Sequence, residues 1–241
     1  MPPRAVLAQN ALASASLMRL SIVIPALDEA ADITATLAAL QPLRARGHEV
    51  IVVDGGSRDA TLLIARLLAD RAFAAPPGRA AQMNAGARRA TGDALLFLHA
   101  DSLLPERAAP AIAQALAAGA RWGRFDVTIR GRPWILRLVA FMMNLRSRAT
   151  GIATGDQGIF VDRALFEQVG GFAAIPLMED VALSKTLKRT AGRPACLALR
   201  VATSGRRWEA RGPWRTIVTM WRLRLAFALG ADPARLARDY R

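Results

Sequence analysis

The chain has 241 residues, of which 53% are hydrophobic, a composition that favours one large α/β domain with a substantial core over a disordered chain. The formal net charge is +14, and arginine supplies all but two of the 33 basic residues, which suits phosphate binding but is also typical of a GC-rich genome. The single cysteine, Cys196, excludes an intrachain disulfide and a cysteine-based zinc site, so a reducing cytoplasm is the expected location. Zinc-finger, RNP and aromatic-interleaved basic patterns are absent from the sequence, so nucleic acid is not an expected partner.

Residues 1–17 are predicted to be a disordered extension or the product of a misplaced start codon. They faintly resemble a signal peptide, but Gln9 and Asn10 interrupt the apolar segment that such a peptide needs. The folded domain is expected to span 18–241. No apolar run in the sequence reaches the roughly 18 residues of a transmembrane helix.

The first part of the chain predicts strands that alternate with helices. Short runs rich in apolar residues predict buried strands at 20–25, 49–54 and 93–99. Helical spacing predicts helices at 32–46, from the Gly55-Gly56-Ser57 turn to about 70, and at 79–90. Strand, helix, strand, glycine-rich turn and helix in this order are typical of a parallel sheet with right-handed crossovers. Residues 18–104 are therefore the expected nucleotide-binding half.

The second part of the chain, 105–212, is the expected acceptor half. Strands are predicted at 122–130, 158–161 and 195–202, and helices at 105–118, 134–145, 163–169 and 181–189. Residues 213–241 are predicted to form a C-terminal amphipathic helix, apolar and studded with arginines up to Leu229. The predicted fold is a single α/β domain with a Rossmann-like, mostly parallel sheet flanked by helices.

Polar side chains follow three of the predicted strands where each strand ends. Asp28 and Glu29 follow the first strand, Asp54 closes the second, and His99 and Asp101 close the third. In open parallel sheets, ligands bind outside the carboxyl ends of the strands. These side chains should therefore line one pocket for a nucleotide, a metal ion, or both.

Each residue type at this edge suits a nucleotide with its metal ion. Mg²⁺ or Mn²⁺ takes oxygen ligands, which Asp101 provides. Gly55 lets the backbone approach a ligand closely, and Arg79 opens a helix whose N-terminus favours a phosphate. A divalent ion bridging the diphosphate of a nucleotide sugar neutralises the charge that develops when the glycosidic bond breaks.

The motifs Pro25 to Glu29, Val53 to Thr61 and His99 to Asp101 resemble those of family 2 glycosyltransferases with the GT-A fold. Segments 78–87, 97–101, 155–158, 178–180 and 206–208 more narrowly resemble the bacterial radical-SAM/selenodomain-associated transferase group, often named with diaponeurosporenoate-type glycosyltransferases. The resemblance covers about residues 18–235. It implies an inverting enzyme that transfers a sugar to an acceptor hydroxyl of a lipid or apocarotenoid. A UDP-sugar is the expected donor, ahead of GDP- and dTDP-sugars.

Carried over residue by residue, the resemblance implies a donor site and a metal site. The residues expected to contact the donor are Asp28, Glu29, Asp54, Gly55, Ser57, Arg79 and Asn84. Asp101 is expected to bind Mg²⁺ or Mn²⁺, together with His99. His99 stands where the family has an aspartate, which puts its ligation of the metal in question.

The resemblance also implies the catalytic and acceptor residues. Asp180 is the expected catalytic base, with Glu179 beside it. Gln157, Arg207 and Trp208 are expected to contact the acceptor or the diphosphate. Ser204 stands where the family motif has glutamine, so acceptor contacts are not assumed there.

Several of these residues also have a purely structural interpretation. Asp28 is suited to capping the helix after it, and Glu179 and Asp180 are suited to the start of the helix at 181. Asp54 is a common turn residue. His99 is suited to a structural hydrogen bond and Trp208 to packing.

Two functional alternatives remain, a nucleotidyltransferase and a non-catalytic module that binds a nucleotide or a membrane. A nucleotidyltransferase usually has a lysine-bearing, glycine-rich loop after the first strand, where this chain has Ala26 to Glu29. The segment 214–229 has the composition of an interfacial helix, and 134–145 offers a second apolar contact. Both segments could instead pack on the sheet. If they bind a membrane, the protein is expected at the inner face of the cell membrane.

Overall fold

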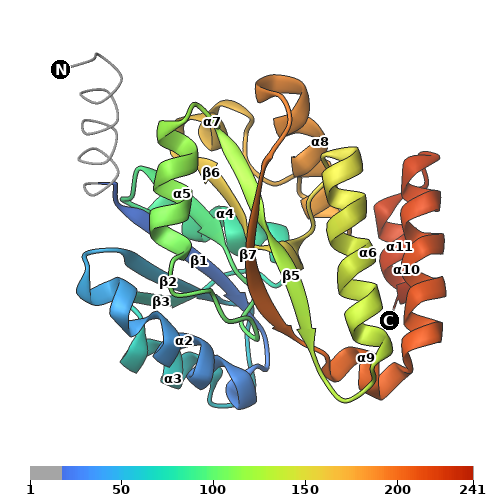
Figure 1. The fold of residues 1–241 in the computed structure, drawn as a ribbon. Helices are drawn as coiled ribbons and strands as arrows, with labels where there is room; N and C mark the ends of the chain where they lie inside the picture. The colour runs from blue at the N-terminus through green and yellow to red at the C-terminus, as the bar shows by residue number, and fades with distance from the viewer. Residues whose placement is uncertain (1–17, 241) are drawn as a thin grey trace.

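The computed structural model describes residues 18–240, so the prediction for residues 1–17 lies outside the described part. A seven-stranded sheet in the order β3-β2-β1-β4-β6-β5-β7 runs through the domain with helices on both faces (Figure 1). The strands are β1 (Leu20–Ala26), β2 (Glu49–Asp54), β3 (Arg71–Ala74), β4 (Ala94–Phe97), β5 (Trp122–Arg130), β6 (Ile159–Asp162) and β7 (Ala195–Ser204). The predicted α/β class with a mostly parallel sheet is confirmed.

The parallel part of the sheet places the polar strand ends at one edge. Strand β1 pairs in parallel with both β2 and β4, and Ala26 lies opposite Asp54. The residues of all three strands are buried. Strand β3 extends this part beyond β2 and was not predicted, because it has only four residues, none of them β-branched or fully buried.

The other part of the sheet contains a reversal of direction. Strand β6 is antiparallel to its neighbours β4 and β5, whereas β5 and β7 are parallel to each other. The register of β5 and β7 shifts between Phe125 and Asp126. Because β6 runs the other way, it begins at the edge where β4 ends, with Ile159 opposite Phe97. The segment just before β6 therefore reaches the polar edge.

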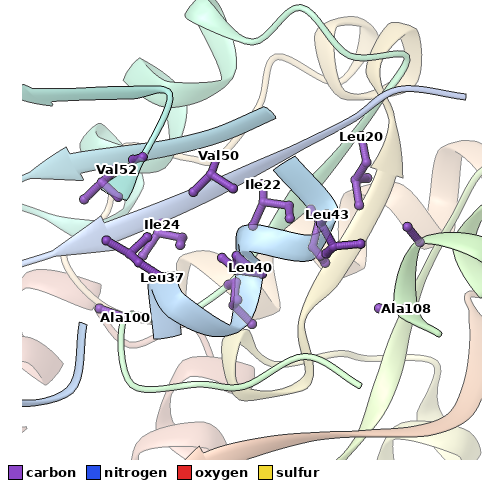
Figure 2. Close-up of a cluster of buried hydrophobic side chains, with 14 of the residues drawn as sticks. Leu20, Ile22, Ile24, Leu37, Leu40, Leu43, Val50, Val52, Ala100 and Ala108 are labelled. Atoms are coloured by element: carbon purple, nitrogen blue, oxygen red, sulfur yellow. The ribbon is translucent and has the colours of Figure 1, made fainter. Parts of the chain in front are cut away.

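Helices cover the sheet on both faces. They are α2 (Ala30–Ala45), α3 (Thr61–Leu68), α4 (Arg79–Arg89), α5 (Ala108–Ala117), α7 (Arg163–Gln168) and α8 (Glu179–Ala191). On one face Ile22 and Ile24 of β1 pack against Leu37 and Leu40 of α2 (Figure 2). On the other face α4 lies so close that a Cβ on Gly86 would lie 2.4 Å from Val23 Cγ1. Glycine is therefore required for this close approach.

The remaining helices form a layer beside β5 (Figure 1). They are α6 (Ile135–Thr150), α9 (Arg206–Arg211), α10 (Pro213–Ala228) and α11 (Pro233–Tyr240). The single helix predicted for 213–241 is thus two helices, because Gly230 adopts a φ of 88° and Pro233 begins a new one. Among residues 18–240, no helix combines the length and apolar character needed to cross a membrane.

Candidate active site

Two turns at the polar edge are bound to each other by side-chain hydrogen bonds. Asp54 Oδ2 accepts from the backbone N–H groups of Gly56 and Ser57, both at 2.9 Å, and Ser57 Oγ donates to Asp54 Oδ1. Ser57 Oγ in turn accepts from Asp28 N at 2.9 Å, and Asp28 Oδ1 accepts from Arg58 N at 2.8 Å. Asp54 therefore fulfils the turn role, and Asp28 does not cap helix α2 with its side chain.

A second set of contacts fixes the start of α2 against the same loop. Asp59 Oδ2 accepts from Ala30 N at 3.0 Å, and Thr61 Oγ1 accepts from Glu29 N at 2.8 Å. The loop after β2 is therefore held rigidly against the loop after β1. Asp28, Glu29, Asp54, Gly55 and Ser57, all predicted donor residues, come together in this pair of loops.

Gln82 of α4 bonds to the ends of the two strands that lead into these loops. Its Nε2 donates to the carbonyls of Ala26 and Val53, both at 2.8 Å, and thereby ties β1 to β2. A Cβ on Gly55 would lie 3.1 Å from the Gln82 amide, so glycine leaves room for this contact. Gln82 was not predicted as a site residue, although it lies in one of the motifs of the resemblance.

Asn84, a predicted donor contact, lies away from the loops. Its Nδ2 donates to Phe172 O at 2.8 Å and its Oδ1 accepts from Phe172 N at 2.9 Å. These two bonds hold the Gly171–Phe172 segment against α4. We therefore leave Asn84 out of the proposed site.

Arg206 borders the site beside Glu29. Its Nη2 donates to Glu29 Oε2 at 2.7 Å and also pairs with Asp32 at 2.6 Å. Desolvation raises the pKa of Glu29 above its ordinary value, with the charge of Asp101 adding to the rise while Arg206 opposes it. Glu29, Asp101 and Arg206 therefore lie close together, and Glu29 reaches the site already paired with a cation.

His99 is paired with a carboxylate that was not predicted as a site residue. His99 Nδ1 lies 3.2 Å from Asp156 Oδ1, and a Cβ on Gly155 would lie 2.4 Å from His99 Nε2. Desolvation by itself would raise the pKa of Asp156, but His99, Arg79 and Arg207 lower it below its ordinary value. With one ring nitrogen paired and the other against the backbone, His99 matches the structural interpretation better than metal ligation.

Glu179 and Asp180 begin α8 beside this pair. Asp180 Oδ2 accepts from Gly155 N at 2.8 Å and Oδ1 accepts from Val181 N at 2.7 Å, so the half-buried carboxylate has a fixed orientation. The residue that caps the helix is Met178, at a φ of 68°, and it makes no side-chain cap. A carboxylate oxygen has two lone pairs, so each oxygen of Asp180 keeps one for a substrate proton.

Glu179 is buried in the same small cavity as Asp180. The cavity is lined by Met83, Phe97, His99, Gly155, Ile159, Phe172, Glu179 and Asp180. Burial, together with the neighbouring charge of Asp180, raises the pKa of Glu179 to about 7. Desolvation by itself would lower the pKa of Arg79, but the charges of Glu179, Asp156 and Asp180 raise it above its ordinary value. Arg79 therefore faces the carboxylates of the site from the start of α4.

The raised pKa of Glu179 predicts a pH-dependent stability. The folded protein holds a proton on Glu179 that the unfolded chain releases near pH 4.5, so the free energy of unfolding should fall as pH rises from 4.5 to 7 and then level off. In Glu179→Gln, the decrease in the free energy of unfolding between pH 4.5 and 7 should be smaller by about 1–3 kcal/mol. Urea unfolding of both proteins at several pH values measures it. Parallel curves for the two proteins would show that Glu179 does not titrate in this range.

The predicted acceptor residues lie in different surroundings. Gln157 is fully buried, and its Oε1 accepts from Thr154 N at 3.2 Å, so we leave it out of the proposed site. Trp208 packs against the buried side chains of α6, in line with its structural interpretation. Arg207 is exposed and donates to the Tyr240 hydroxyl at 2.6 Å. It lines a pocket of about 210 Å³ with Arg211, Arg215, Thr216, Thr219, Asp239 and Tyr240.

The residues at this edge fit a metal ion held mainly by a substrate. Among residues 18–240, no group of three or more His, Cys, Asp or Glu side chains is arranged to bind a metal. Asp101 Oδ1 meets only long contacts, from the hydroxyls of Ser102 and Thr203 at 3.3 and 3.4 Å. Mg²⁺ is commonly bound by one or two carboxylates, substrate phosphates and water. Asp101 alone can supply the carboxylate that this mode of metal binding requires.

The fold and this edge define a class of protein with the GT-A architecture, in which a nucleotide would bind at the carboxyl ends of β1, β2 and β4. The model of glycosyl transferase family 2 matches residues 21–167, and the chain belongs to this family. Among curated proteins, none matches the chain.

Solved structures show the same fold at low sequence identity. S. aureus TarS 1–349 in complex with UDP-GlcNAc has a TM-score of 0.62 and 20% identity, over 78% of this chain and 58% of that chain. Glucosyl-3-phosphoglycerate synthase from Mycobacterium tuberculosis, with Mn²⁺, UDP and glucosyl-3-phosphoglycerate, has a TM-score of 0.60 and 19% identity, over 81% and 74% of the chains. In a second structure of TarS 1–349, the match covers 61% of that chain, so this chain spans less than two thirds of TarS 1–349 in both.

Proposed function

We propose that the protein is an inverting glycosyltransferase that moves a sugar from a nucleotide-sugar donor, a UDP-sugar, to an acceptor hydroxyl. The observation that carries the proposal is the oriented carboxylate of Asp180, which lies at the start of α8 and lines a small cavity with His99, after β4, and Gly155, before β6. Family membership supports the reaction class, and the motifs at 155–158 and 206–208 support the narrower transferase group named above.

The donor would occupy the edge formed by the loops around Asp28 and Asp54. The cation Arg79 and the N-terminus of α4, which Arg79 opens, favour an anionic diphosphate there. Asp101 would hold Mg²⁺ or Mn²⁺ together with the diphosphate. When bound, the ion supplies neutralisation of the charge that develops on the leaving diphosphate.

Asp180 would act as the base toward the acceptor. It would accept the proton of the acceptor hydroxyl, and the oxygen would attack the anomeric carbon on the face opposite the diphosphate. Glu179 lies next to Asp180 and has a pKa of about 7, so it is partly protonated near neutral pH. The pair therefore carries less than two full negative charges.

Calorimetry with a panel of nucleotides and nucleotide sugars tests the donor assignment. UDP and a UDP-sugar should bind in the presence of Mn²⁺, and slow release of UDP from a UDP-sugar should accompany binding. Preference for a nucleoside triphosphate with release of pyrophosphate would favour a nucleotidyltransferase instead. Binding without any turnover of a donor would favour a non-catalytic module.

We also propose that the acceptor is a lipid or other apolar molecule presented at a membrane surface. Large apolar side chains are exposed along α6 and α10 in helical spacing, and we call them the apolar face: Trp134, Leu138, Phe141, Met142, Leu145, Trp214, Val218, Trp221, Leu225 and Leu229. Each helix packs inward by its other side, and Ile217 of α10 packs against the buried side chains of α6, so the two helices are neighbours (Figure 1). Exposed apolar patches of this kind mark interaction sites.

Arginines beside the apolar face suit anionic lipid headgroups. Arg137 of α6 and Arg215 and Arg222 of α10 are exposed. Aromatic side chains at the acyl boundary with arginines at the headgroups are the composition of an interfacial helix. This arrangement supports a place at the inner face of the cell membrane.

Sedimentation with vesicles tests the apolar face. The wild type should bind vesicles containing anionic lipid at low salt and bind them more weakly at high salt, because salt screens exposed charges. The double variant Phe141→Ser, Trp221→Ser should bind at least about tenfold more weakly, since each aromatic side chain loses apolar burial in the lipid.

A matched control changes two exposed leucines elsewhere. Leu63 and Leu67 of α3 are 63% and 75% exposed and lie outside the apolar face. The variant Leu63→Ser, Leu67→Ser should bind vesicles like the wild type. Equal binding by both double variants, or none by the wild type at low salt, would remove the membrane from the proposal.

A further inference from the structure

The turn that leads into α8 has an unusual backbone conformation. Met178, which directly precedes Glu179 and Asp180, adopts a φ of 68°. Among residues 18–240, Asp28 is the other non-glycine residue with a positive φ. A residue with a long side chain adopts this left-handed conformation only where the surrounding structure holds it. Because Met178 makes no side-chain cap for the helix, packing of its side chain is left to hold the turn.

Packing connects this turn to the C-terminal helices. Met178 and Val181, which flank the Glu179–Asp180 pair, are 4% and 8% exposed and belong to one buried apolar cluster. The other two buried members of this cluster are Leu223 of α10 and Leu236 of α11. The carboxylate proposed as the base therefore lies between two residues whose side chains pack with α10 and α11.

Leu236 is the side chain by which α11 joins the cluster. Of the residues of α11, all of which the structure describes, Leu236 is the buried one. Tyr240 holds the end of the helix, because its hydroxyl accepts from Arg207 Nη1 at 2.6 Å and its carbonyl accepts from Arg211 Nη1 at 3.0 Å. These bonds fix α11 against α9, so Leu236 has a fixed position beside the turn.

The orientation of Asp180 depends on the position of this turn. Its Oδ1 accepts from Val181 N at 2.7 Å and its Oδ2 from Gly155 N at 2.8 Å. Val181 belongs to the cluster, so a shift of the turn would move the carboxylate together with one of its donors and away from the other. A general base must lie within hydrogen-bond reach of the proton that it accepts, and a small misplacement lowers the rate.

We propose that Leu236 is a positioning residue for Asp180 and acts through Met178 and Val181. Leu236 is not among the residues that line the cavity at Asp180, so it acts by holding the turn rather than by contact with a substrate. Asp180 is the base only under the proposed function, on which this proposal rests. Helices α10 and α11 are then part of the catalytic apparatus as well as of the fold.

Amide hydrogen exchange, followed residue by residue by NMR, tests the positioning without any substrate. Leu236→Ala leaves space in the cluster, so the N–H groups of Val181 and Gly155 should exchange at least about tenfold faster than in the wild type. Leu236→Met keeps the volume of the side chain and should stay close to the wild type. Unchanged exchange of both amides in Leu236→Ala would overturn the proposal.

Leu43→Ala is the matched control for loss of stability. Leu43 of α2 is 5% exposed, close to the 4% of Leu236, and belongs to a different core cluster. The control variant should leave the exchange of Val181 and Gly155 unchanged. An equal rise in both variants would show that general destabilisation causes the effect and would overturn the proposal. If Leu236→Ala does not fold, Leu236→Val should show a smaller rise in the same two amides.

Turnover tests whether this orientation matters for the reaction. Leu236→Ala should lower kcat for a UDP-sugar about tenfold or more, while calorimetry gives an unchanged affinity for UDP. In Asp180→Asn, which already lacks the base, Leu236→Ala should lower kcat no further, because both changes act on the same group. A full additional loss in the double variant would place the effect of Leu236 elsewhere and overturn the proposal.

The two measurements separate failure of this proposal from failure of the proposed function. If the wild type turns over no nucleotide sugar, the role of Asp180 as the base is lost, and amide exchange still decides whether Leu236 orients the carboxylate. If the wild type is active and Leu236→Ala keeps both its kcat and its slow exchange, only the role of Leu236 is lost.

Discussion

Asp180→Asn is expected to lower turnover by about 10²–10⁴-fold while UDP still binds, the scale on which loss of a general base acts. The amide has nearly the shape of the carboxylate but does not accept a proton. Both oxygens of Asp180 accept from backbone N–H groups, so the amide nitrogen of the variant side chain would face one of these donors and lose one bond. The measurement is steady-state turnover of a UDP-sugar together with calorimetry of UDP.

A carboxylate elsewhere on the surface provides the control. Glu167 of α7 is 68% exposed in its side chain and pairs only weakly with Arg163 at 3.9 Å. Glu167→Gln removes the same charge and should leave turnover unchanged. A fall of less than tenfold in Asp180→Asn would mean that another group is the base, and Glu179 would then be the residue to change next.

Asp101→Asn is expected to lower metal-dependent turnover by about 10²-fold or more, because a bound ion contributes several kcal/mol of charge stabilisation. The fold should survive, since the amide oxygen of the variant keeps the long contacts with Ser102 and Thr203. Calorimetric titration of Mn²⁺ into the protein with UDP should show weaker binding in the variant. Turnover measures the catalytic part of the effect.

Glu106, five residues further along the chain, is the control for local charge. It is exposed, and Glu106→Gln should leave both Mn²⁺ binding and turnover as they are. EDTA should abolish turnover by the wild type. Full activity of the wild type in EDTA would show that the reaction does not depend on a metal ion, and the role of Asp101 would be withdrawn.

Most of the fold could be predicted from apolar runs and their boundaries. Strand β2 was predicted with the bounds that the structure gives, because six apolar or flanking residues lie between clear turn signals. Strand β3 and helix α9 were missed, because Arg71–Ala74 and Arg206–Arg211 are short, partly exposed and without an apolar period. The reversal at β6 is set by how the chain connects the strands, which local sequence does not encode.

The sequence predicted the positions of site residues that directly follow a strand. It did not predict the hydrogen-bond partners of the other side chains. The residues around Asp54 come together as expected. Asn84 and Gln157 lie in matching motifs but direct their hydrogen bonds to Phe172 and Thr154, which no spacing reveals. Asp156 lies inside one of the matching motifs, but only the structure shows that it pairs with His99.

The ion pair between Glu29 and Arg206 has a consequence for the order in which the molecule assembles. These residues are 177 positions apart, whereas the hydrogen bonds around Asp54 join residues two or three positions apart. Short loops close at a small cost in chain entropy and long ones at a larger cost, so local turns form before distant pairs. During refolding, the hydrogen bonds of Asp54 in the loop after β2 should therefore form early. The ion pair between Arg206 and Glu29 should form only after β7 has joined the sheet.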